Sequence, residues 1–112
     1  ELARIAADRG YRLIAAAREH PSDDESALPA DADVEWVIGD LATSEGVAAL
    51  LGAVGDAPIA LLCANAGEGL GDAVVDQDFS RVRHMIDTNI TGTVELVQEV
   101  ARRMQAEGSG RI

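Results

Sequence analysis

Pro-Ile-Ala-Leu-Leu-Cys-Ala-Asn-Ala-Gly, residues 58–67, is the stretch that decides the predicted fold. A short apolar run between a proline and a glycine is typical of a strand buried on both faces of a parallel sheet. The run ends in small residues and one amide side chain, which would let a flat ligand lie across its carboxyl end. Open α/β sheets bind ligands at that edge. We therefore expect Asn65, Ala66 and Gly67 to form the floor of a binding site.

The segments around this strand alternate between helical and extended patterns. In chain order we expect a helix over 1–9, a strand over 12–17, a strand over 34–38, a helix over 44–54 capped by Ser44, the strand over 59–64 and a long helix over 78–106. The apolar positions of the long helix recur in steps of three and four: Phe79, Val82, Ile86, Ile90, Val94, Val97, Ala101 and Met104. This alternation predicts the α/β class, with a doubly wound parallel sheet.

Residues 19–33 interrupt the pattern with a polar, acidic stretch that contains Pro21 and Pro29. We interpret it as a solvated surface connection with a turn or two of helix around residues 23–28, because a proline confines any helix there.

Composition excludes several classes of function. The 112 residues suffice for at most one domain, and a net charge of −11 argues against binding to nucleic acid or to anionic membrane surfaces. No apolar run approaches the ~20 residues of a membrane-spanning helix. The chain has one cysteine, Cys63, which cannot form an internal disulfide, so we expect the protein to be located in a reducing cytoplasm. We expect Cys63 itself to be a small, buried hydrophobic residue.

Arg18 directly follows the strand over residues 12–17. In dinucleotide-binding folds an acidic residue near this point binds the ribose 2′-hydroxyl, whereas an arginine accommodates a 2′-phosphate through charge-assisted hydrogen bonds. An arginine standing alone would more often be an ordinary surface residue, but in this context the sequence favours NADP over NAD.

Asp40 and Leu41 follow the next strand. The Asp40 carboxylate could accept a hydrogen bond from an adenine amino group, or it could stabilise the start of the following helix, where negative charge is favourable. Leu41 could cover an adenine face or simply pack. Asn65 could hold a ribose, or it could only form a turn.

Asn89 is unusual because it lies inside the long helix, in the segment Asp-Thr-Asn-Ile-Thr-Gly over 87–92. This segment has poor helix propensity, and Gly92 alone costs about 1 kcal/mol relative to alanine. A local rule broken within a well-patterned helix often marks a functional or strained site, although Asn89 could also be a satisfied core residue. His20 and His84 have no metal-ligand spacing, so we predict no metal site and place both on the surface.

Together these residues resemble the short-chain dehydrogenase/reductase family. The matching pieces are Ala17-Arg18, Asp40-Leu41, Cys63-Ala64-Asn65-Ala66-Gly67 and Asn89-Ile90-Thr91-Gly92, in the family's order and spacing along essentially the whole chain. The family's Asn-Asn-Ala-Gly pattern has Ala64 at its first position here. The resemblance implies a Rossmann-like, NADP-binding domain over residues 1–112.

The resemblance also implies a role for each residue. It implies an NADP-dependent oxidoreductase that transfers a hydride within an alcohol/carbonyl pair. Arg18 would bind the 2′-phosphate, Asp40 and Leu41 the adenine, and Asn65, Ala66 and Gly67 the ribose end. Asn89 would be the catalytic asparagine that holds a water through its backbone, and the helix over 78–106 would be half of a homo-oligomer interface.

Three of the family's features are missing from these residues. Its glycine-rich pyrophosphate loop would precede Glu1, and its catalytic Ser and Tyr-x-x-x-Lys would follow Ile112. The chain has no lysine, so the acid–base pair that this chemistry needs cannot come from within it. We therefore expect an internal part of such an enzyme, with the first strand and the later strands of the sheet absent, inactive by itself.

Two alternatives remain at this stage. One is a non-catalytic NADP-sensing domain on the same fold. The other is a different doubly wound protein, such as a methyltransferase or a receiver domain, although Arg18 and the absence of lysine speak against these.

Overall fold

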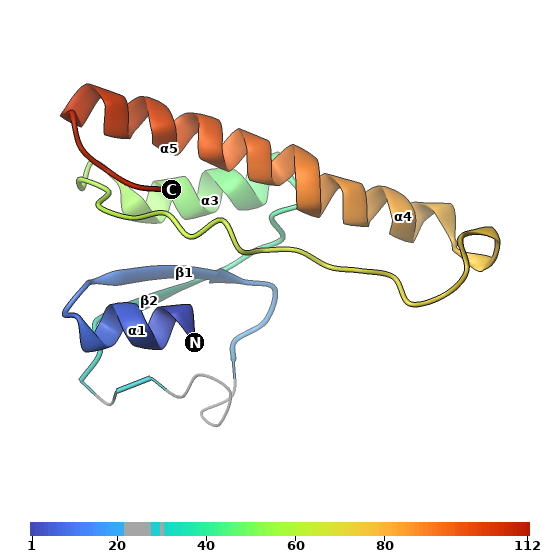
Figure 1. Cartoon of the computed structure of the whole chain (residues 1–112), viewed down its shortest axis with the longest axis horizontal. Coiled ribbons are helices and arrows are strands. Elements are labelled where there is room, and N and C mark those ends of the chain that lie inside the picture. Colours follow the sequence, from blue (N-terminus) through green and yellow to red (C-terminus); the bar gives the residue numbers. More distant parts are fainter. Residues whose placement is uncertain (22–27, 30) are drawn as a thin grey trace.

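The computed structural model describes residues 1–21, 28–29 and 31–112 (Figure 1). Their elements are α1 (Leu2–Asp8), β1 (Leu13–Ala17), β2 (Val34–Ile38), α3 (Ser44–Val54), the 3-10 helix η1 (Val74–Asp76), α4 (Phe79–Ile86), the π-helical turn η2 (Asp87–Gly92) and α5 (Thr93–Glu107). The helical turn expected around 23–28 rests mainly on residues outside the described ranges.

The sheet consists of β1 and β2, which pair in parallel, with Leu13 opposite Val34 and Ala17 opposite Ile38. Helix α1 lies on one side of the strands and α3 and α5 lie on the other (Figure 1). The predicted α/β class with parallel strands is therefore confirmed, as a partial Rossmann-like fold. Because the two strands run in register, Arg18 and Asp40 emerge at the same edge.

The predicted strand over 59–64 is wrong as a regular strand. Leu61 makes an isolated parallel bridge with Arg111, in which the Leu62 amide donates to the Arg111 carbonyl at 2.9 Å. Ile59 and Leu62 are partly buried against the core, but Leu61 and Cys63 are exposed. A strand needs a neighbour to form a ladder, and among the described residues only the short segment at Arg111 pairs with this run. The expected burial of Cys63 is wrong for the same reason.

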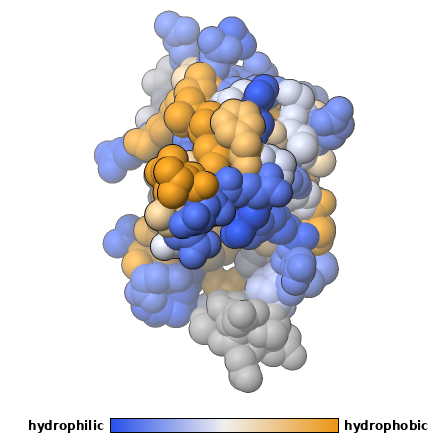
Figure 2. Space-filling view, turned by 90° about the vertical axis from the view of Figure 1, so that its right-hand side faces the viewer, coloured by the Kyte–Doolittle hydropathy of each residue, from blue (hydrophilic) through white to orange (hydrophobic). Residues whose placement is uncertain are grey.

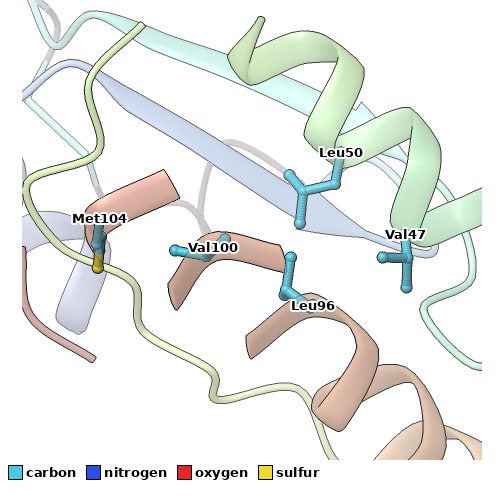
Figure 3. Close-up of a cluster of buried hydrophobic side chains, with 5 residues drawn as sticks. All are labelled: Val47, Leu50, Leu96, Val100 and Met104. Atoms are coloured by element: carbon cyan, nitrogen blue, oxygen red, sulfur yellow. The ribbon is translucent and has the colours of Figure 1, made fainter. Parts of the chain in front are cut away.

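The hydrophobic core lies between α3 and α5. Figure 3 shows Val47 and Leu50 of α3 directed toward Leu96 and Val100 of α5. Met104 completes this buried cluster, and partly buried residues of both strands pack against it. The spacing of apolar residues that predicted a helix over 44–54 thus also identified the face of α3 that packs against α5. The cap is one residue earlier than predicted, because the Thr43 side chain accepts the Gly46 amide.

The long helix is confirmed over residues 79–107, but its predicted apolar face is mostly not the buried one. Core contacts come from Leu96, Val100 and Met104, whereas Phe79, Ile90 and Val94 are 73%, 57% and 59% exposed. Val94 lies two residues, or about 200°, from Leu96 on a helix of 3.6 residues per turn. The helix therefore has a buried apolar face and a separate exposed one, and several of the predicted apolar positions lie on the exposed face.

Helix boundaries follow ordinary capping chemistry. The Asp78 carboxylate accepts the Ser80 amide at the start of α4, and Gly108 ends α5 in the left-handed region at φ +70°. Within the described ranges, none of the helices combines the length and apolarity that crossing a membrane requires.

Candidate functional site

A crevice of about 190 Å³ opens at the carboxyl edge of β1 and β2. Three segments line it: the end of β1, the residues after β2, and the loop after the run over 59–64. A fourth contribution comes from the π turn. The lining residues are Ala16, Ala17, Arg18, Gly39, Asp40, Leu41, Ala66, Gly67, Glu68 and Thr88. Half of these are alanine or glycine, so the crevice stays open.

Five of the six predicted cofactor-binding residues lie together in this crevice: Arg18, Asp40, Leu41, Ala66 and Gly67. Asn65 is not among the lining residues; it is exposed, and its backbone amide donates to the Cys63 carbonyl in a tight turn. The turn interpretation of Asn65 is thus confirmed, and a contact with ribose stays a prediction.

Asp40 fixes the chain between β2 and α3. Its Oδ1 accepts the Ala42 amide at 2.9 Å, and its backbone carbonyl accepts the Thr43 amide and hydroxyl. These bonds place Asp40 in the turn that leads into α3, whereas a favourable effect of its charge on the helix start stays a prediction. Leu41 is partly buried against the core and also lines the crevice. Its position is therefore compatible with packing against the core and with covering an adenine face.

His84 contradicts the prediction that it is a simple surface residue. Its Nε2 lies 2.9 Å from Asp40 Oδ2 and its Nδ1 lies 2.6 Å from Glu68 Oε1. The second Glu68 oxygen, Oε2, lies 3.4 Å from Arg18 Nη1. A chain of polar contacts therefore runs from Arg18 through Glu68 and His84 to Asp40, and it joins the ends of both strands to α4.

These contacts change two acid–base equilibria. The hydrogen bond to Asp40, followed by the one to Glu68, holds the pKa of His84 above its ordinary value. The Ala42 amide, followed by His84, holds the pKa of the Asp40 carboxyl below its ordinary value. Both shifts favour the ionised forms, because each hydrogen bond is strongest when its carboxylate and the imidazolium are charged.

Asn89 uses its side-chain amide to hold the loop. Its Nδ2 donates to the Glu68 carbonyl at 2.8 Å and its Oδ1 accepts the Glu68 amide at 2.9 Å. Gly67 permits this approach, since a Cβ there would lie 3.2 Å from Asn89 Oδ1. The asparagine that breaks the helical pattern is therefore a partner of the crevice wall, through Glu68, rather than a core residue of the sheet.

Two glycines bring helices close to the crevice. A Cβ on Gly92 would clash with the Leu41 carbonyl, and one on Gly46 would clash with the Asp40 carbonyl. The backbone of residues 40–41 is thus held between η2 and α3. This close approach explains why a glycine of poor helix propensity stands within the long helix.

Sequence reasoning missed Glu68 and His84. One feature of the sequence could have indicated Glu68, which directly follows the predicted floor residues. A carboxylate near the predicted phosphate-binding Arg18 needs a positively charged or hydrogen-bonding partner. His84 could not be found from spacing, because the residues it contacts are 44 and 16 positions away.

Among the described residues, no group of three or more His, Cys, Asp or Glu side chains has an arrangement that could hold a metal ion. His84 is engaged through both ring nitrogens, and a metal ligand needs a free lone pair on one of them.

Comparison with known proteins agrees with this geometry. The family model for short chain dehydrogenases matches residues 1–112. The chain belongs to the short-chain dehydrogenase family. Members of this family are oxidoreductases, which agrees with the enzyme class implied by the sequence resemblance.

Solved structures show the same fold. A short chain dehydrogenase/reductase family protein is 30% identical over 96% of this chain, with a TM-score of 0.77. The bulky-bulky ketone specific alcohol dehydrogenase from Comamonas testosteroni is 27% identical over 97%, also at 0.77. A short-chain dehydrogenase from Sphingobium yanoikuyae, in complex with NADPH, is 26% identical over 97%, at 0.73.

The chain spans 45%, 45% and 44% of the lengths of these three proteins, respectively. No curated protein matches it.

Proposed function

We propose that residues 1–112 form the adenosine end of the cofactor site of an NADP-dependent oxidoreductase acting on an alcohol/carbonyl pair. The observation that carries this proposal is the crevice in which Arg18, Asp40, Leu41, Ala66 and Gly67 meet. One related structure holds NADPH, which supports the choice of cofactor class.

The lining residues fit this end of a phosphorylated dinucleotide. Arg18 is the single basic residue among them, and its side chain is 67% exposed at the crevice mouth. Guanidinium groups bind phosphate through paired, charge-assisted hydrogen bonds. Asp40 supplies an acceptor for an exocyclic amine. The buried Thr88 hydroxyl on the same wall has no hydrogen-bond partner among the described residues.

The bound cofactor would supply the hydride, and this chain would hold its adenosine end. Asn89 is proposed as the family's catalytic asparagine. Its side-chain amide is already paired with the Glu68 backbone, so any hold on a water falls to its own backbone. Asn65 is proposed to reach the ribose from the edge of the loop.

Other features support the remaining proposals. The exposed thiol of Cys63 suits a reducing compartment, which supports a cytoplasmic location. The exposed apolar face of α4 and α5 supports a homo-oligomer. Figure 2 shows apolar side chains gathered at the end of the molecule where η1 and α4 meet; Val74, Val75 and Phe79 are its exposed apolar residues. Neither nucleic acid nor a membrane is a proposed partner.

The test is Arg18→Ala in the full-length protein that carries this chain. We expect NADPH binding to weaken by about 1.5–3 kcal/mol, the size of a hydrogen bond to a charged group, while NADH binding stays nearly constant. Fluorescence titration measures both affinities. Ketone-dependent oxidation of NADPH is a second readout, which residues 1–112 alone should lack.

Arg12→Ala is the matched control, because Arg12 lies at the other end of β1 and pairs with Glu35. It should leave both affinities unchanged. Equal loss of NADH and NADPH binding in Arg18→Ala, or no loss, would contradict the assignment of Arg18.

A further inference from the structure

Glu68 occupies an unexpected position for a site that binds phosphate. Its carboxylate lines the crevice, and Oε2 lies 3.4 Å from Arg18 Nη1. The Glu68 side chain is only 25% exposed, so solvent screens it less than it screens Arg18. A phosphate that approaches Arg18 would therefore meet a carboxylate already paired with that guanidinium.

Three contacts keep Glu68 in this position. Asn89 binds its backbone amide and carbonyl, which fixes where the side chain begins. His84 Nδ1 holds Oε1 at 2.6 Å, and Asp40 in turn holds the other side of the imidazole. The contact with His84 is shorter than the contact with Arg18. The Glu68 carboxylate is thus held toward α4, and its contact with the Arg18 guanidinium is the weaker of the two.

Charge within the crevice adds to this competition. Asp40 and Glu68 contribute two carboxylates to the lining, against the one cation of Arg18. A phosphate monoester carries a charge of about −1.5 to −2 near neutral pH, so the Glu68 carboxylate beside Arg18 repels it. The His84 imidazolium, which contacts Glu68 from outside the crevice lining, offsets part of this repulsion. NADH lacks the 2′-phosphate, so it places no phosphate beside Arg18 and Glu68 and does not meet this repulsion.

From this arrangement we propose that Glu68 is a specificity-determining residue, whose carboxylate competes with the cofactor 2′-phosphate for Arg18, and that His84 is a positioning residue that limits this competition by holding Glu68. The inference rests on the proposed function and deepens it. It assigns the degree of NADP preference to a pair of residues outside the predicted cofactor set.

The experiment measures dissociation constants for NADPH and NADH with the full-length protein and its Glu68→Gln variant. Glutamine keeps the backbone pair with Asn89, because that pair does not use the Glu68 side chain. We expect Glu68→Gln to bind NADPH about tenfold more tightly and NADH within about threefold of the wild type, since one like charge is removed beside the phosphate.

Two further variants separate charge from shape. Glu68→Asp keeps the charge and should show no gain in NADPH affinity. Glu45→Gln removes the same charge from an exposed position of α3 and should leave both constants unchanged.

His84→Gln tests the positioning role. Without the imidazole the carboxylate is free to pair more closely with Arg18, so NADPH binding should weaken about threefold or more. Because His84 acts through Glu68, the double variant should bind NADPH like Glu68→Gln alone. Additive effects in the double variant would overturn the role of His84.

The two levels of the proposal fail differently. If the wild-type protein binds neither dinucleotide, the proposed function and this inference are both wrong. If it binds NADPH with an affinity that Glu68→Gln leaves unchanged or weakens, the inference alone is overturned.

Discussion

His84 is held by a carboxylate at each ring nitrogen, Asp40 at Nε2 and Glu68 at Nδ1. Only the imidazolium can donate from both nitrogens, so these contacts hold the pKa of His84 above its ordinary 6.5. The stabilisation is complete below about pH 6.5 and is lost as the pH rises through the higher folded-state pKa. Asp40 behaves oppositely: its pKa lies below 3.8, so its contribution is present above that pH and lost as the pH falls further.

We therefore expect the free energy of unfolding to fall in the wild type as the pH rises above about 6.5, and to fall less in His84→Gln, because the linked proton is absent. Urea denaturation across this range measures it. His20→Gln is the control, since His20 is the other histidine and is exposed. An identical pH dependence in wild type and His84→Gln would contradict the cluster's role.

Among single residues, the sequence predicted those site residues whose role follows from their position next to a strand. Arg18 directly follows β1 and Asp40 comes two residues after the end of β2, so strand prediction placed them at one edge. Glu68 and His84 escaped because their roles depend on contacts between segments far apart in the chain. Nothing local distinguishes His84 from a solvated histidine on an amphipathic helix.

Among the elements, the π turn over 87–92 lies close against the loop between β2 and α3 at Gly92. Gly92 is buried, and a Cβ there would clash with the Leu41 carbonyl. Helix propensity alone would make Gly92→Ala stabilising by about 1 kcal/mol. Overpacking against the backbone costs about 1–3 kcal/mol, so we expect the clash to prevail and the variant to be less stable.

Gly52→Ala is the matched control, because Gly52 lies inside α3 and a Cβ there would meet no neighbouring element within 4 Å. This variant should gain about 1 kcal/mol from helix propensity alone. Thermal or urea unfolding of the two variants measures the difference. A stabilised Gly92→Ala would show that η2 does not hold residues 40–41.

Elements were predictable where their own residues determine them. Helices α1 and α3 and strands β1 and β2 follow local apolar patterns, and each pattern was identified correctly within a residue or two. The run over 59–64 has equally good strand composition, yet it forms a single bridge, because ladder formation depends on a neighbour. Periodicity likewise cannot tell which of two apolar faces of α5 meets the core.

At the level of the whole molecule, the two apolar faces of the long helix have different fates. Leu96, Val100 and Met104 pack against α3 and the strands, while Phe79, Ile90 and Val94 stay exposed on a different side of the helix. A row of large apolar side chains in water is typical of a surface that meets another protein. The exposed apolar surface continues from α4 into α5. It could therefore pack against the same helix of a second copy of the chain, related by a twofold axis.

We expect Ile90→Glu to dissociate this proposed homo-oligomer. Burial of an isoleucine side chain contributes about 1.5–3 kcal/mol, and an unpaired carboxylate in its place adds a desolvation penalty. The subunit dissociation constant should therefore rise at least about tenfold, which size-exclusion chromatography with light scattering measures on the full-length protein. Leu2→Glu, at an exposed apolar residue of α1, should leave the assembly intact. A wild-type monomer, or an assembly that Ile90→Glu leaves unchanged, would exclude this face as the interface.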